Sequence, residues 1–167
     1  MMITVISGTN RKGSRTRNIV FYYRDELLKM GEHPQVLLPE GIDLNKRTPE
    51  LQRVEDDILI PSDKFIFILP EYNGSFPGAI KALIDLCRVP ECFYGKKALL
   101  TGVADGRAGN LRGMEHFTGI LNHMKVIVHP NKLPISVLKK LVNTEGDLID
   151  EDTKKAIEKQ LKEFIVF

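Results

Sequence analysis

Five short, nearly continuous apolar runs, separated by amphipathic stretches, constrain the fold of this chain most strongly. The runs are MITVIS (2–7), PQVLL (34–38), KFIFILP (64–70), KALLTGV (97–103) and KVIVHP (125–130). Apolar runs of this length are typical of strands that are covered on both faces. Such strands, joined by crossover helices, form a parallel sheet between two helical layers. We therefore predict an α/β fold, a three-layer α/β/α sandwich with five parallel strands.

The stretches between these apolar runs show the periodicity of amphipathic helices. Apolar side chains recur every three or four residues in four segments. These are Ile19, Tyr23, Leu27 and Met30; Ile80, Leu83 and Cys87; Leu111, Met114, Phe117 and Leu121; and Ile157, Leu161 and Phe164. The last helix is expected to start at Asp152 or Thr153, and residues 41–57 are expected to form a loop with one short helix. Residues 1–167 are predicted to form one domain.

Composition and charge limit the kinds of partner. The chain carries 24 basic and 22 acidic residues, interleaved along its length, for a formal net charge of +2. This balance gives no case for binding nucleic acid or a membrane surface. The two cysteines, Cys87 and Cys92, do not complete a zinc cluster, and no signal peptide or membrane-spanning segment is evident. We expect a reduced, cytoplasmic protein in which Cys87 is an inert core residue.

Three glycine-rich loops follow the first, third and fourth predicted strands. They cover residues 7–16, 70–86 and 102–117. In an open parallel sheet the ligand binds beyond the carboxyl ends of the strands, where the strand order reverses. The three loops are therefore predicted to line one pocket.

The first loop, SGTNRKGSRT, has the glycine spacing of a P-loop without its chemistry. Ser14 stands where a P-loop has its lysine, and no apolar strand ends in a lone aspartate that would hold magnesium. Asn10 stands where the dinucleotide-binding fingerprint needs a glycine. These differences argue against nucleotide hydrolysis and against dinucleotide binding at this loop.

The same loop is rich in hydrogen-bond donors. Thr9, Ser14 and Thr16 carry hydroxyls, and Arg11 and Arg15 carry guanidinium groups. The first N–H groups of the following helix would face the same point, so the loop suits the dianion of a phosphate monoester. Taken alone, it is equally compatible with a solvated basic turn that caps a helix.

The second loop, PEYNGSFPG, indicates a flat heterocyclic ligand. Gly74 and Gly78 let the backbone approach a ring, Tyr72 supplies an aromatic edge, and Asn73 can bond a polar edge. A flavin needs all three features. The alternative is a plain turn before a helix that Pro77 introduces.

Together, SGTNRKGSRT, LPEYNGSFPGAIKALIDL and GRAGNLRGMEHFTGILNHM resemble the signature segments of the NAD(P)H-dependent FMN reductase family. This flavodoxin-like group includes quinone, chromate and azo-dye reductases. The resemblance implies a flavodoxin-like fold with strand order 2-1-3-4-5, FMN as cofactor, and NADPH or NADH as co-substrate. It also implies a small-molecule electron acceptor and a homodimer or homotetramer.

The family patterns imply roles for individual residues. The first pattern, G-S-x-R-x-x-S-x-N, implies that the FMN phosphate is bound by Thr9, Arg11, Ser14 and Thr16, with Arg15 beside them. The second pattern, P-x-Y-N-x-S-x-P-G-x-L-K-x-x-I-D, implies that the isoalloxazine ring is lined by Pro70, Glu71, Tyr72, Asn73, Gly74 and Ser75. The third, S-P-G-x-x-G-G, aligns on residues 104–110 and brings Asp105, Gly106 and Arg107 to the far side of the flavin. The chain departs from these patterns at Thr9, Thr16, Ile80, Ala104 and Asp105.

The implied reaction needs no catalytic side chain. NAD(P)H would pass a hydride to the flavin and leave before the acceptor binds, a ping-pong cycle in which N–H groups near Asn73 and Asp105 steady the reduced ring. Arg107 either meets an anionic substrate or is solvated. No metal is expected, because His116 and His123 have no third ligand; they are expected to face a neighbouring helix or subunit. A flavodoxin-type electron carrier and a non-enzymatic flavin-binding module remain alternatives, although a carrier is usually acidic.

Overall fold

A parallel sheet lies at the centre of the molecule, in a computed structural model that describes residues 1–167. Its strands are β1 (Ile3–Ser7), β2 (Gln35–Leu37), β3 (Lys64–Pro70), β4 (Lys97–Val103) and β5 (Ile127–Val128), in the order β2-β1-β3-β4-β5. All pair in parallel with their neighbours. The predicted flavodoxin-like α/β/α fold and its strand order are confirmed.

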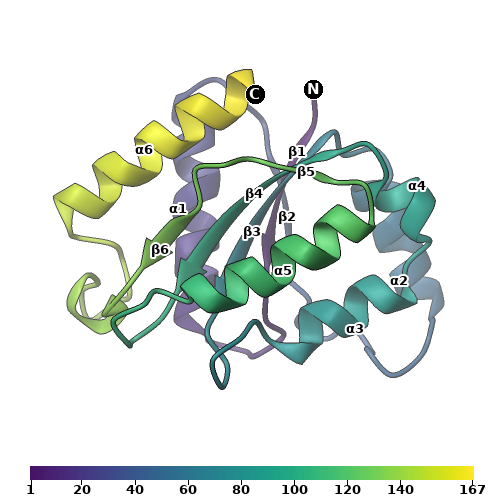
Figure 1. Ribbon diagram of the computed structural model, residues 1–167, viewed down its shortest axis with the longest axis horizontal. Helices are drawn as coiled ribbons and strands as arrows, with labels where there is room; N and C mark the ends of the chain where they lie inside the picture. Colours follow the sequence, from purple (N-terminus) through teal and green to yellow (C-terminus); the bar gives the residue numbers. More distant parts are fainter.

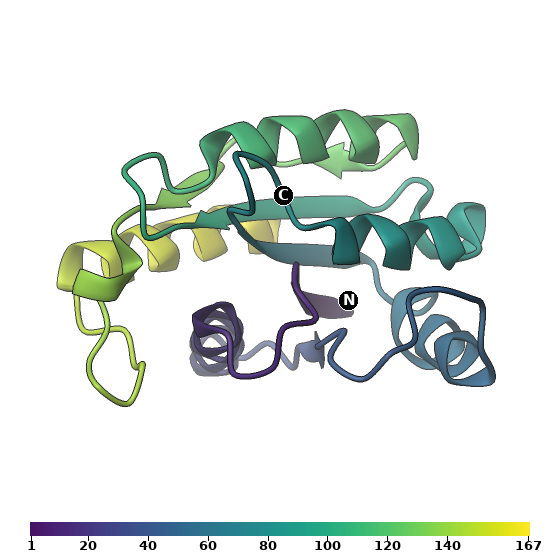
Figure 2. The same cartoon turned by 90° about the horizontal axis from the view of Figure 1, so that it is seen from below.

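Helices cover both faces of the sheet (Figures 1 and 2). One layer consists of α1 (Arg15–Lys29) and α6 (Glu151–Val166), and the other of α2 (Pro49–Val54), α3 (Gly78–Leu86), α4 (Val89–Phe93) and α5 (Leu111–His123). Alternate residues of β3 divide between the two cores: Phe65 and Phe67 pack with the second layer, whereas Ile66 and Ile68 pack with the first. This alternation explains why β3 is apolar throughout, since both of its faces are covered.

A buried polar contact ties the first helical layer to the sheet. Gln160 in α6 is fully buried and accepts a hydrogen bond from the Tyr23 hydroxyl in α1 at 2.7 Å. Its amide donates to the Leu100 carbonyl of β4 at 3.2 Å and to the Asn131 carbonyl at 2.8 Å. The contact therefore fixes α1 and α6 relative to β4.

The edge of the sheet beside β4 differs from the prediction. The expected strand at 125–130 is only two residues long, and an additional parallel strand, β6 (Leu133–Ile135), pairs with the second half of β4. Pro130 and Pro134 have no amide hydrogen and are suited only to such an edge. The fifth position of the sheet is thus divided between two short strands.

Three other elements refine the predicted boundaries. The expected short helix within 41–57 is α2, capped by Thr48, and it continues as the π-helical turn η1 (Glu55–Leu59). Helix α4 was not predicted. Helix α6 is capped by Asp150, whose carboxylate accepts the Thr153 N–H at 2.9 Å, and not by Asp152 or Thr153. No helix combines the length and apolar character that a membrane crossing requires.

Candidate functional site

A cavity lies at the carboxyl ends of β1, β3 and β4. Strand order reverses at β1, which has β2 on one side and β3 on the other, and the loops after these strands gather at one edge of the sheet (Figure 1). The cavity has a volume of about 480 Å³, within the range of small-molecule sites. Its lining comprises Arg11, Lys12, Gly13, Ser14, Arg15, Thr16, Pro70, Glu71, Tyr72, Val103, Ala104, Asp105 and Leu138.

A glycine lets the first loop leave β1 directly against β3. The Gly8 N–H donates to the Ile68 carbonyl at 2.8 Å. A Cβ at this position would lie 2.8 Å from the Leu69 side chain and 2.9 Å from the Ile68 oxygen. Only glycine fits there, so the loop is held close to the end of β3.

The hydroxyl of Ser14 is buried and has no hydrogen-bond partner within the protein. The residue occupies the N-cap position of α1 with an extended backbone, but its side chain does not cap the helix. A buried hydroxyl of this kind normally has a partner, because leaving it unpaired costs free energy. The first N–H groups of α1 lack intrahelical acceptors as well.

The charges around Ser14 favour an anion. Arg11, Lys12 and Arg15 line the cavity, and the first turn of α1 contains no acidic residue. The positive end of the helix dipole adds to this potential. The residues present therefore fit a phosphate group.

Thr9 lies behind the cavity and does not line it. Its side chain is buried, and its Oγ1 accepts the Arg11 N–H at 3.2 Å and forms a hydrogen bond with the Tyr72 hydroxyl at 2.9 Å. Tyr72 does line the cavity. Thr9 thus joins the first loop to the second.

The second loop contains a tight turn. Asn73 and Gly74 have φ values of 52° and 77°, and Tyr72 and Ser75 exchange backbone hydrogen bonds of 2.8 and 3.1 Å. Positive φ at both central residues is the signature of a type I′ turn, for which Asn-Gly is a favoured sequence. Pro70, Glu71 and Tyr72 line the cavity, whereas Asn73, Gly74 and Ser75 extend beyond it.

Helix α5 supports this turn from the other side. His116 Nδ1 lies 2.9 Å from Ser75 Oγ, so within the chain this exposed histidine contacts the second loop. Asn110, the left-handed N-cap of α5, donates its side-chain amide to the Leu69 and Pro70 carbonyls at 2.9 and 3.0 Å. Asn110 therefore fixes the end of β3, a role that the sequence did not indicate.

The third loop forms the opposite wall. Asp105 lines the cavity, and its Oδ2 lies 3.4 Å from Arg15 and 3.3 Å from Lys139. Gly106 and Arg107 are exposed and do not line the cavity. The short helix η2 (Leu138–Lys140), which follows β6 in the chain, contacts this loop, because its Leu138 N–H donates to the Ala104 carbonyl at 3.0 Å.

The prediction missed several lining residues. Four of them lie within or beside the predicted loops: Lys12, Gly13, Val103 and Ala104. Their position next to predicted site residues was the signal in the sequence that could have identified them. Leu138 comes from a segment without a motif, and only the path of the chain brings it to the cavity.

The strand order and the cavity at the switch point define a flavodoxin-like α/β protein. A family model described as NADPH-dependent FMN reductase matches residues 1–137. The chain belongs to this family.

Individual relatives agree with this placement. The NAD(P)H-dependent FMN reductase of Pseudomonas aeruginosa is 32% identical over 119 residues, covering 68% of this chain and 63% of the relative. A 2-hydroxy-1,4-benzoquinone reductase from Burkholderia sp. is 23% identical and is covered over 66% of its length, with 70% of this chain matched. The chain thus spans less than two thirds of these two relatives. An NADPH azoreductase from Bacillus sp. is 26% identical over 98% of this chain and 90% of its own.

Solved structures share the fold. FerB from Paracoccus denitrificans, a flavoenzyme NAD(P)H:(acceptor) oxidoreductase, has a TM-score of 0.76 with 23% identity, covering 98% of this chain and 94% of that one. A flavodoxin from Streptococcus pneumoniae has a TM-score of 0.68 with 13% identity, covering 99% of both chains. At these identities the likeness concerns the fold alone.

Proposed function

We propose that this chain is an FMN-dependent oxidoreductase that transfers reducing equivalents from NADPH or NADH to a small acceptor such as a flavin, quinone, chromate or azo compound. The observation that carries the proposal is the buried, unpartnered Ser14 hydroxyl beside Arg11, Lys12 and Arg15, in a cavity at the switch point of the sheet. Family membership supports the reaction class.

The cavity residues divide into two groups by their chemistry. Ser14, Thr16 and the first N–H groups of α1 would hold the phosphate of FMN, with Arg11 and Arg15 supplying positive charge. Pro70, Glu71 and Tyr72 would lie along the isoalloxazine, opposite Asp105. When bound, FMN supplies the hydride and electron transfer.

Residues beyond the cavity would meet the outer part of the ring or the second substrate. Asn73, Gly74 and Ser75 lie on the turn that extends past the lining, and Gly106 and Arg107 are exposed on the facing loop. Backbone N–H groups of this turn are suited to an oxygen or nitrogen that gains negative charge. The two substrates would use this open side in turn, which is ping-pong order.

The domain organisation, the cellular location and the oligomeric state are part of the same proposal. We infer that residues 1–167 act as one domain, that the protein is cytoplasmic, and that it assembles as a homodimer or homotetramer. Two free cysteines are compatible with a reducing compartment.

The proposal is tested on the purified protein. We expect a flavin absorption spectrum, either as purified or after reconstitution with FMN, and rapid anaerobic bleaching by NADPH or NADH. Added quinone should then restore the oxidised spectrum. A protein that binds FMN but is bleached slowly or not at all would be an electron carrier or a binding module, and a protein that cannot take up FMN would overturn the proposal.

A further inference from the structure

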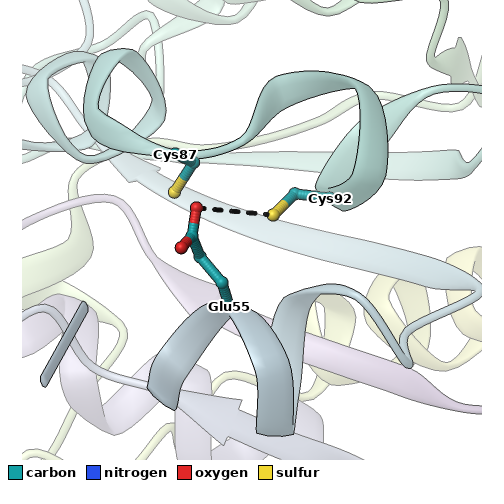
Figure 3. Close-up of side chains that lie close together, drawn as sticks. All are labelled: Glu55, Cys87 and Cys92. Carbon is teal, nitrogen blue, oxygen red and sulfur yellow. Dashed lines mark hydrogen bonds between the residues drawn. The ribbon is translucent and has the colours of Figure 1, made fainter. Parts of the chain in front are cut away.

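Two cysteines and a carboxylate that do not line the cavity lie close together (Figure 3). Glu55 belongs to η1, Cys87 follows the last residue of α3, and Cys92 lies in α4. Their sulfur and oxygen atoms all lie within 4.8 Å of one another, and Cys92 Sγ is 4.0 Å from Glu55 Oε1. Glu55 and Cys92 are fully buried, whereas Cys87 retains 8% exposure.

Arginines already satisfy the carboxylate of this cluster. The Arg47 guanidinium binds both oxygens of Glu55, with Nη1 3.0 Å from Oε1. Arg88 adds its backbone N–H at 2.5 Å and its Nε at 3.3 Å. A metal ion would have to displace these donors and would stand beside two positive charges, so the cluster does not suit a cation. The two sulfurs remain as its reactive atoms.

The backbone holds the two sulfurs close together. Helix α3 ends at Leu86, the extended conformation of Cys87 turns the chain, and the Arg88 N–H is fixed on Glu55. Pro90 lies in the first turn of α4, which brings Cys92 back toward Cys87. The proximity of the two thiols therefore results from the Glu55 contacts and the short connection between the helices.

We propose that Cys87 and Cys92 form a reversible intramolecular disulfide when the protein meets hydrogen peroxide or an organic hydroperoxide. One thiolate attacks the peroxide oxygen, which releases hydroxide or alkoxide and leaves a sulfenic acid. The second sulfur then attacks the first, the S–S bond forms, and the sulfenic oxygen leaves as water with the thiol proton. Overall two thiols lose two electrons and two protons, and the peroxide is reduced to water, with an alcohol in the organic case.

The groups around the two cysteines favour a thiolate at Cys92, and the partial exposure of Cys87 opens the pair to an oxidant. The neighbouring Cys87 thiol lowers the pKa of Cys92, and Lys96 and Arg88 act in the same direction against burial and Glu55. The same contact, together with burial, raises the pKa of Cys87, so the attacking thiolate is that of Cys92. The 8% exposure of Cys87 gives a small oxidant access to the pair. Bond formation needs the sulfurs to approach to about 2.05 Å, and Glu55 keeps its arginine partners when Cys92 moves away.

The test uses the 167-residue protein after reconstitution with FMN. After peroxide treatment, denaturation and alkylation with N-ethylmaleimide, the intact mass should fall by two hydrogen atoms with no maleimide added. Trypsin should then release residues 82–88 and 89–96 as one disulfide-linked pair, because the chain contains only two cysteines. Dithiothreitol should restore two alkylatable thiols.

Matched variants separate this reaction from simple oxidation. Cys87→Ser and Cys92→Ser should each give a dimedone-trapped sulfenic acid or a mixed disulfide in place of the linked peptides. In the wild-type protein, two free thiols after peroxide, direct conversion to sulfinic acid, or disulfides only between molecules would overturn the proposal. Zinc retained in stoichiometric amount with both thiols protected would also overturn it.

Discussion

The Oγ of Ser14 is buried and unpaired, and the residue lies at the N-terminus of α1. Ser14→Ala removes no hydrogen bond from the protein, so the free energy of unfolding should stay the same or rise slightly. FMN binding should weaken by about 1.5–3 kcal/mol, the usual contribution of a hydrogen bond to a charged group, which is roughly tenfold or more in Kd. Fluorescence titration measures this change.

Riboflavin, which lacks the phosphate, is the control ligand. Its affinity should be equal in the wild-type protein and in Ser14→Ala. An equal loss of affinity for FMN and riboflavin would mean that Ser14 contacts a part of the ligand other than the phosphate. No loss for either ligand would mean that Ser14 does not contact the ligand.

Tyr72 links the two loops through its hydroxyl. Tyr72→Phe keeps the ring on the cavity wall but breaks the bond with Thr9. We expect unfolding free energy to fall by about 0.5–1.5 kcal/mol and FMN affinity to fall with it, because the two loops are no longer fixed to each other. Urea denaturation and fluorescence titration measure the two quantities.

Tyr94→Phe is the matched control, since Tyr94 is an exposed tyrosine at the carboxyl end of α4 that does not line the cavity. It should change neither quantity. A Tyr72→Phe protein that behaves like the control would show that the Thr9 bond has no part in holding the loops.

At the scale of elements, one side chain joins α5 to β3. Asn110→Ala leaves the Leu69 and Pro70 carbonyls without their donor and puts alanine at a φ of 60°. The unfolding free energy should fall by about 2–4 kcal/mol, because both a buried polar group and a left-handed conformation are affected.

Asn110→Gly separates these two causes. Glycine accepts the positive φ but supplies no donor, so its loss should be smaller than that of alanine and still measurable by urea denaturation. Equal losses for the two variants would mean that the backbone conformation contributes nothing, and a wild-type stability in Asn110→Gly would mean that the amide contacts contribute nothing.

At the scale of the whole molecule, Glu55 makes stability depend on pH. Burial acts to raise the pKa of Glu55, but the hydrogen bonds from Arg47 and from the Arg88 backbone outweigh it and hold the pKa below its usual value. A lowered pKa in the folded state means that the stabilisation is fully present above the unfolded-state pKa, about 4.3, and is lost as pH falls through the folded value.

Glu55→Gln removes this contribution. The variant should be less stable than the wild type at neutral pH, and the difference between them should shrink as the solution becomes acidic. Thermal unfolding followed across this pH range measures the effect. A constant difference at all pH values would contradict the assignment to Glu55, and so would a difference that grows in acid.

Much of the architecture could be predicted because its causes are local. The apolar run 64–70 is long enough for a strand and apolar on both faces, which places it at the centre of a parallel sheet. The helical periodicity of 111–121 similarly predicts α5. Once the strands are parallel, the loops after β1, β3 and β4 must lie at one edge, so the general position of the cavity follows from the chain order.

The tertiary structure decided which side chains meet. Thr9 belongs to the phosphate loop by its position in the chain, yet its hydroxyl is bound to Tyr72 and Arg11. Leu138 reaches the cavity, and Glu55 reaches Cys92, only because the backbone brings distant segments together. Periodicity and turn chemistry act over a few residues, whereas these contacts depend on the path of the whole chain. The sequence therefore specified the sheet and the edge that carries the site, and long-range packing specified the partners of each side chain.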